Sequence, residues 1–225
     1  MTFSPPVRYA AVSGPRSAVQ AEPAFMRPVT KSRPRTKPSQ ERRDELMNAA
    51  QRLFLENGVG STSIEQITGG ADVAKGTFYL HFASKDDVVL ALRDRFVREL
   101  LESIKTAIAR RPEEDWRGKL AAWAKAGITY FLDAAALHNL VFHHYQHPSP
   151  KEHSDNIVVV HLSELLEAGT AAGAWSVDDR DFTATFLFHG LHGVVHDALA
   201  KKKPVARGAL VTKMQQACFR AVGLR

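Results

Sequence analysis

The chain has 225 residues, 44% of them apolar, an ordinary composition for one or two globular domains. Its formal net charge of +6 and sequence pI of about 9.5 favour an anionic partner such as nucleic acid. Cys218 is the only cysteine, which excludes an intrachain disulfide and a cysteine-based zinc site and fits a reducing compartment.

A membrane anchor is not expected. The most apolar stretch, residues 118–145, is interrupted by Lys119, Lys125 and Asp133. No run approaches the roughly 20 apolar residues that a membrane-spanning helix needs. The N-terminus also lacks the apolar segment of a secretory signal. We therefore expect a soluble, cytoplasmic protein.

The positive charge is concentrated at the N-terminus. Residues 1–38 hold seven basic side chains and one acidic side chain, whereas residues 39–86 hold five basic and seven acidic ones. Seven of the eleven prolines also lie in residues 1–38, without helical or strand periodicity between them. This composition is typical of disorder, so we expect a disordered basic tail that adds non-specific DNA contacts.

The folded part is predicted to begin with an amphipathic helix at Ser39. Its apolar residues recur with the spacing i, i+3, i+4, i+7, i+8, which is one stripe of a helix. They are Leu46, Ala49, Ala50, Leu53 and Phe54. Gly58 follows where a helix commonly ends in a left-handed residue.

Two short helices and one long helix are predicted next. Ser63 and Gln66 have the spacing of a capping box, which starts a helix over 63–71. A turn leads to a third helix over 74–80. Ser84 and Asp87 form another cap and open a long helix that ends before Pro112.

The remaining sequence predicts further helices. Helical periodicity continues over 113–132, 134–145, 154–170, 178–200 and 204–222. No period-two alternation is long enough for a sheet. The predicted fold class is therefore all-α.

Helices 63–71 and 74–80, joined by a tight turn behind an amphipathic helix, match the helix-turn-helix plan, whose second helix lies in a DNA major groove. The residues themselves resemble the N-terminal domain of TetR-family transcriptional repressors over residues 42–98. The motifs that carry this resemblance are Lys75-Gly76-Thr77-Phe78-Tyr79, His81-Phe82 and Ser84-Lys85. The resemblance implies a DNA-binding domain over residues 39–86 and a helical effector-binding and dimerisation domain over 87–225.

The resemblance also implies which residues meet DNA. Those that it implies are Thr62, Ser63, Lys75, Gly76, Thr77, Tyr79 and Lys85, with His81 as a candidate. Arg42 and Arg43 are added on charge, because a net-acidic domain over residues 39–86 must contact DNA through a few placed cations. Lys75 would contact a phosphate or a guanine edge, and Gly76 would let the helix approach closely. Lys85 would hold a phosphate at the N-terminus of the long helix. For His81, DNA contact and packing beside a core phenylalanine both remain open.

Two positions depart from the family pattern. Asp72 stands in the turn where the family usually has glycine, and aspartate tolerates a left-handed backbone better than most residues. Ala74 stands where the family usually has a capping serine, and the missing cap costs about 1 kcal/mol.

A candidate effector pocket lies on the central helices. Apolar walls with a few polar groups are typical of small-molecule sites, so we expect an apolar or aromatic effector. The candidate lining residues are Trp123, Tyr130, Phe131, Phe142, Tyr145, His161, Leu165, Phe186 and His189. An ordinary aromatic core accounts equally well for about half of this set.

The last two helices are the candidates for a homodimer interface, which would place two helix-turn-helix domains on a palindrome. Their apolar residues are Phe182, Phe186, Leu191, Val194, Val195 and Ala198 on the first, and Leu210, Val211, Met214, Ala217, Cys218 and Ala221 on the second. An intrachain core is the alternative for these faces.

The resulting prediction is a repressor that a small-molecule effector releases from a palindromic operator. The alternative is a metal- or pH-responsive regulator, because the sequence is rich in histidine after residue 137. His189, His192 and His196 share one helix face, and His143 and His147 share another. No catalytic or phosphate-loop motif is present, so neither an enzyme nor a cofactor is expected, and a metal-dependent enzyme is only a weak alternative. A sequence-independent DNA-coating protein acting through the basic tail is a third, weaker alternative.

Overall fold

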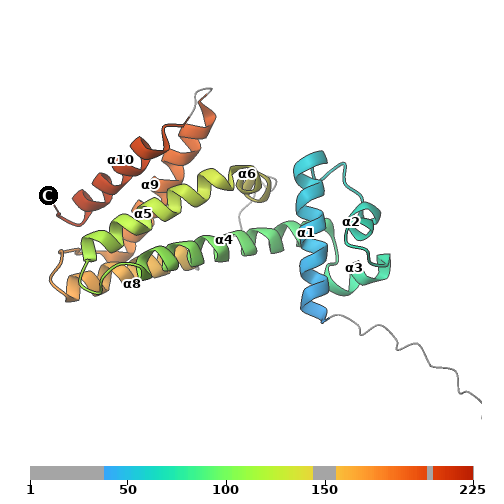
Figure 1. The fold of residues 1–225 in the computed structure, drawn as a ribbon, viewed down its shortest axis with the longest axis horizontal. Helices are drawn as coiled ribbons and strands as arrows, with labels where there is room; N and C mark the ends of the chain where they lie inside the picture. Colours follow the sequence, from blue (N-terminus) through green and yellow to red (C-terminus); the bar gives the residue numbers. More distant parts are fainter. Residues whose placement is uncertain (1–37, 144–155, 202–204, 225) are drawn as a thin grey trace, which may run out of the picture. The chain divides into compact units, whose positions relative to one another are not determined.

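The computed structural model describes residues 38–143, 156–201 and 205–224, and these residues form helices with no strand among them (Figure 1). The all-α prediction is confirmed for this part of the chain. The elements are α1 (Ser39–Asn57), α2 (Ile64–Gly70), α3 (Lys75–His81), α4 (Lys85–Ala109), α5 (Trp116–Asp133), α6 (Ala135–His143), α8 (Ile157–Ala171), α9 (Arg180–Ala200) and α10 (Arg207–Ala221). The tail expected over residues 1–38 lies outside the described residues except for Pro38, and so do Tyr145 and His147.

The predicted caps are confirmed. Ser63 and Gln66 form a capping box at α2, and Ser84 and Asp87 form one at α4. Asp72 has φ +51°, so it takes the left-handed conformation at the turn between α2 and α3. The N-cap residue of α3 is Ala74, which makes no side-chain hydrogen bond to the helix. The position of α3 therefore depends on packing.

A continuous apolar core joins the N-terminal helices to the rest of the chain. Phe54 of α1, Ile67 of α2 and Phe78 of α3 are buried together with Val88 and Leu92 at the start of α4. α4 then runs on from this part of the core to pack along α5 (Figure 1). One helix, α4, therefore contributes to both parts of the core.

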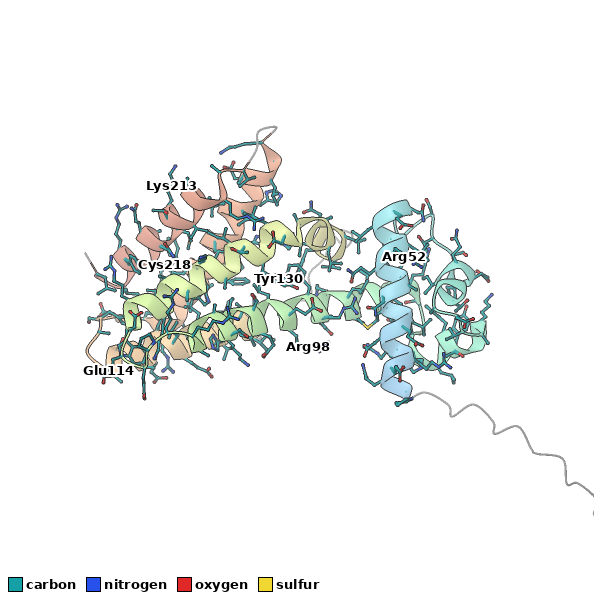
Figure 2. The ribbon with its side chains drawn as sticks, viewed as in Figure 1. Arg52, Arg98, Glu114, Tyr130, Lys213 and Cys218 are labelled. Atoms are coloured by element: carbon teal, nitrogen blue, oxygen red, sulfur yellow. The ribbon has the colours of Figure 1, made fainter. Side chains whose placement is uncertain are left out.

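Helix α5 is the centre of the C-terminal half and packs against α4, α9 and α10. At Gly127 the contact with α9 is close, because a Cβ there would lie 2.9 Å from Leu191. Figure 2 shows Cys218 on the side of α10 that faces α5 and Lys213 on its outer side. Burial raises the pKa of the Cys218 thiol to about 12, so this cysteine is unreactive.

The prediction that α10 carries the dimer interface is wrong for its main apolar residues. Val211, Met214 and Cys218 are buried within the chain, where α10 packs on α5. Leu191 and Val195 of α9 are buried as well. The sequence showed these stripes but not which helix covers them.

A membrane-spanning helix is absent from the described residues, since none of their helices has the length and apolar character that a span requires.

Candidate nucleic-acid interface

Helix α3 has one anchored face and one exposed face. Phe78 is fully buried and packs edge to face with Tyr79 and against Phe82. Lys75, Gly76 and Tyr79 are exposed, and Thr77 is half-buried. Figure 1 shows α2 and α3 on the side of α1 that is turned away from α5. The arrangement presents a short helix whose outer residues are accessible to a large partner.

Leu80 is a residue of this face that the sequence reasoning missed. Its side chain is 82% exposed, which is the largest exposure among the described large apolar residues. A leucine on a DNA-reading helix can contact the methyl group of thymine. The missed signal was its position directly after Tyr79, on the same helix as the predicted contacts.

Lys75 is held by Glu65 in the absence of DNA. Its Nζ lies 2.5 Å from Glu65 Oε1, and both side chains are more than half exposed. The hydrogen bond from Lys75 lowers the pKa of Glu65, and the same bond raises the pKa of Lys75. The pair joins α2 to α3, so Lys75 has to exchange this carboxylate for any phosphate or base.

Lys85, which was predicted to hold a phosphate, binds backbone carbonyls in this structure, and its contact with DNA stays a prediction. Its Nζ donates to the carbonyl oxygens of Val59 at 2.7 Å, Thr62 at 2.7 Å and Gly60 at 3.3 Å. The carbonyls of this loop have no helical partner, and an ammonium group satisfies three of them. Lys85 therefore ties the start of α4 to the loop before α2.

Thr62 is also structural in this conformation. Its side chain is 1% exposed, and its hydroxyl donates to the carbonyl oxygens of Gly58 at 2.8 Å and Leu53 at 3.3 Å. In this structure the hydroxyl is engaged within the chain, and the contact of Thr62 with the DNA backbone stays a prediction. Ser63, the next residue, is exposed at the N-terminus of α2, where its hydroxyl accepts a hydrogen bond from Gln66 N.

The two arginines near the start of α1 make local contacts. Arg42 forms an ion pair with Glu45 at 3.3 Å. Arg43 donates to Met47 Sδ at 3.3 Å, and its guanidinium lies 4.9 Å from the centre of the Phe82 ring. Arg43 thus helps to hold the segment after α3 against α1. His81 is half-buried at the end of α3, and its role stays a prediction.

The predicted effector residues divide into buried and exposed sets. Trp123, Phe131 and Leu165 are buried, whereas Phe142, Phe186 and His189 are exposed. Trp123 Nε1 and His161 Nδ1 are buried without a hydrogen-bond partner among the described residues. Burial lowers the pKa of His161, so the ring is neutral at pH 7. Orphaned buried polar atoms of this kind suit a bound polar group.

Two surface hollows of the described residues lie elsewhere. One of about 520 Å³ is lined by residues of α1 and α4, and another of about 570 Å³ is lined by residues near the start of α5 and the end of α8. Neither contains a residue of the predicted effector set.

The histidine contacts in the structure differ from the clusters that helical spacing predicted. His138 Nε2 lies 2.8 Å from His192 Nε2, and the His138 ring stacks on Phe142. Within the described ranges, no group of three metal-binding side chains comes together. His192 thus pairs with a histidine of α6 that the spacing along α9 did not reveal.

The sequence matches the family described as "Bacterial regulatory proteins, tetR family" over residues 46–92. It is 30% identical over 105 residues to the HTH-type transcriptional activator FasR of Mycolicibacterium smegmatis, covering 47% of each chain. The chain thus spans about half the length of this curated relative.

Two solved structures are similar in fold. The fatty acid degradation regulator FadR of Bacillus halodurans superposes with a TM-score of 0.64 at 23% identity, over 84% of this chain and 100% of that one. The complex of RolR with resorcinol gives a TM-score of 0.56 at 19% identity, over 83% and 90% of the two chains. The likeness to both supports a shared fold. Residues 46–92 of this chain therefore match the DNA-binding domain of the tetR family of bacterial regulatory proteins.

Proposed function

We propose that this protein is a homodimeric transcriptional repressor that binds a palindromic operator and is released by a small apolar or aromatic effector. Residues 39–86 would bind DNA, and residues 87–225 would bind the effector and the second subunit. The observation that carries the proposal is the exposed face of α3, which is anchored from behind by Phe78.

The exposed face supports reading of the major groove. Lys75 would leave Glu65 for a phosphate or a guanine edge, and Tyr79 would donate to a phosphate. A Cβ at Gly76 would meet nothing within 4 Å, so folding does not require glycine there. Close approach of the backbone to DNA would account for it. Leu80 would contact a thymine methyl group.

The dimer interface is proposed on α8 and α9. Ile157 and Val160 of α8 and Phe182, Phe186 and Val194 of α9 are large apolar side chains that remain exposed. The rings of Phe182 and Phe186 stack with an interplanar angle of 8°. Exposed large apolar side chains on two helices that pack together are typical of interaction surfaces, and a second copy would cover them with two-fold symmetry.

The effector is proposed to bind in the C-terminal helices. Buried aromatic residues would supply apolar contact, and Trp123 Nε1 and His161 Nδ1 would accommodate polar groups of the ligand. One fold neighbour is a regulator of fatty acid degradation, and another forms a complex with resorcinol. We therefore propose a molecule with an acyl chain or an aromatic ring and one or two polar groups.

The test is selection of bound sequences from random DNA, followed by footprinting of the DNA beside the gene. A protected palindrome with the selected half-sites is expected. Binding without any sequence preference would overturn the proposal. A thermal-shift screen with saturated fatty acids and small phenols tests the effector class, because a ligand raises apparent stability by RT ln(1 + [L]/Kd).

A further inference from the structure

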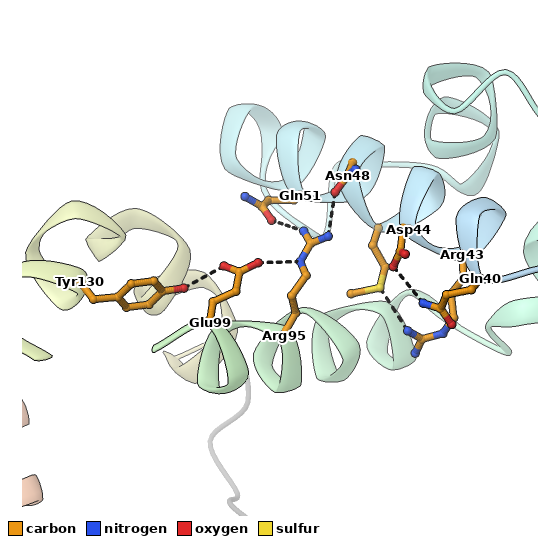
Figure 3. Close-up of polar contacts among 9 residues, drawn as sticks. Gln40, Arg43, Asp44, Asn48, Gln51, Arg95, Glu99 and Tyr130 are labelled. Atoms are coloured by element: carbon orange, nitrogen blue, oxygen red, sulfur yellow. Dashed lines mark hydrogen bonds and ion pairs between the residues drawn. The ribbon is translucent and has the colours of Figure 1, made fainter. Parts of the chain in front are cut away.

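A chain of polar side chains joins α5 to α1 through α4 (Figure 3). Tyr130 Oη of α5 donates to Glu99 Oε2 of α4 at 2.9 Å. The other carboxylate oxygen of Glu99 lies 3.9 Å from Arg95 Nε. Arg95 in turn donates to Asn48 Oδ1 at 2.7 Å and to Gln51 Oε1 at 2.5 Å, both on α1.

The contact of Arg95 with α1 has a defined geometry. Asn48 and Gln51 are three residues apart and therefore lie on one face of α1. The planar guanidinium group donates hydrogen bonds to both amide oxygens at once. This pair of bonds restricts rotation and sliding of α1 along α4. The buried residues around this point are apolar, and apolar contacts have little directional preference. Arg95 is therefore placed to set the register between α1 and α4.

Tyr130 donates to the carboxylate oxygen of Glu99 that does not face Arg95. Its ring packs edge to face on Phe96, with a centroid distance of 5.1 Å, and Figure 2 shows it between α5 and α4. Burial and the carboxylate of Glu99 raise the pKa of Tyr130 well above its usual range, so the hydroxyl stays protonated and donates. If the hydroxyl is withdrawn, Glu99 loses this donor and keeps Arg95, whose Nε lies 3.9 Å from its carboxylate, as a cationic partner.

The junction has room for such a rearrangement. The hollow of about 520 Å³ is lined by Asn48, Gln51, Arg52, Leu55, Arg95 and Glu99. Arg95 and Glu99 can therefore change partners without displacing core side chains.

We infer that Tyr130, Glu99 and Arg95 are positioning residues that couple the effector-binding helices to the orientation of the helix-turn-helix domain. With Tyr130 on Glu99, Arg95 holds Asn48 and Gln51 and fixes α1. When a ligand draws the Tyr130 hydroxyl away, Glu99 closes on Arg95 and competes with the two amides, which loosens α1 on α4. The inference rests on the proposed function for its consequence at DNA, but the link itself is intramolecular.

The decisive experiment therefore measures the link without DNA. Nitroxide labels at Glu56→Cys on α1 and Thr106→Cys on α4 report the distance between these exposed positions, and Cys218 stays unlabelled because it is buried. We expect a single narrow distance distribution that broadens or shifts in Tyr130→Phe and in Arg95→Lys. Arg98→Lys, an exposed position on the same helix, is the matched control and should leave it unchanged. Distributions that are identical in all four proteins would overturn the inference.

A second measurement tests the consequence at DNA. The wild type should bind the selected palindrome about tenfold more tightly than versions with one base pair inserted or removed between the half-sites, since two fixed domains require one spacing. Tyr130→Phe and Arg95→Lys should reduce this ratio to about twofold or threefold, with unchanged sequence preference in each half-site. A wild type without any palindrome would contradict the proposed function alone, whereas an unchanged ratio in the variants would contradict the inference.

Discussion

Lys75 and Glu65 form a 2.5 Å ion pair between α3 and α2, so the cation that we propose to contact DNA is held by a carboxylate of its own domain. Glu65 also lies in the first turn of α2, where an acidic side chain is favourable to the helix. The pair is therefore a local stabiliser that competes with DNA for Lys75.

Replacing Glu65 with glutamine should strengthen DNA binding. The change removes both the competitor of Lys75 and a negative charge beside the phosphates, and we expect a gain of about threefold to tenfold at low salt. Fluorescence anisotropy at two salt concentrations measures it, and the gain should shrink at the higher one. Glu56→Gln, an exposed change at the end of α1, is the control. Weaker binding by Glu65→Gln would show that its role is to orient α2.

Lys85→Met should lower stability and leave the salt dependence of DNA binding unchanged. The substitution removes the donor to three loop carbonyls, which should cost about 1–3 kcal/mol in the free energy of unfolding. Urea unfolding measures this cost, with exposed Lys105→Met as the control. A salt slope reduced by about 0.9 would instead identify Lys85 as a phosphate ligand.

Leu80→Ala should change sequence preference and leave stability unchanged. The exposed side chain contributes little to the core, whereas a lost thymine contact should cost about 1 kcal/mol at one position per half-site. Parallel selections with the wild type, Leu80→Ala and the control Leu90→Ala on α4 measure the preference. The same preference in all three would place Leu80 outside the interface.

Phe186→Asp on α9 should produce a monomer, whereas Lys213→Asp on the outer side of α10 should not. A charge on the proposed interface would be desolvated without a partner in the dimer. Sedimentation velocity over a range of protein concentrations distinguishes the two states. A dimer that survives Phe186→Asp and is lost in Lys213→Asp would move the interface to α10.

His161 should contribute to acid sensitivity. Burial lowers the pKa of His161 below its ordinary value of 6.5, while Glu164 of α8 and Glu102 of α4 oppose that shift and Lys105 of α4 adds to it. Below pH 6.5 the unfolded chain therefore binds a proton that the folded chain resists, and stability falls as pH decreases. His161→Gln should make the Tm less dependent on pH between 7 and 5, and exposed His196→Gln is the control. An unchanged pH dependence would assign the sensitivity to other groups.

Local features were predictable from the sequence because they depend on residues within one turn of each other. The capping boxes at Ser63 and Ser84 and the left-handed turn at Asp72 are of this kind. The order of the helices followed from apolar periodicity, and the helix-turn-helix assignment from the motif around Lys75.

The tertiary structure decided what each side chain faces. Lys85 donates hydrogen bonds to carbonyls 23 to 26 residues away, and Arg95 donates hydrogen bonds to side-chain amides 44 and 47 residues away. An apolar stripe likewise does not identify the surface that covers it. From the sequence, the stripe of α10 could pack against either a second subunit or α5. Spacing along a helix determines which residues share a face. Only the packing of helices determines whether that face meets solvent, the core or another charge, because this depends on groups far apart in the chain.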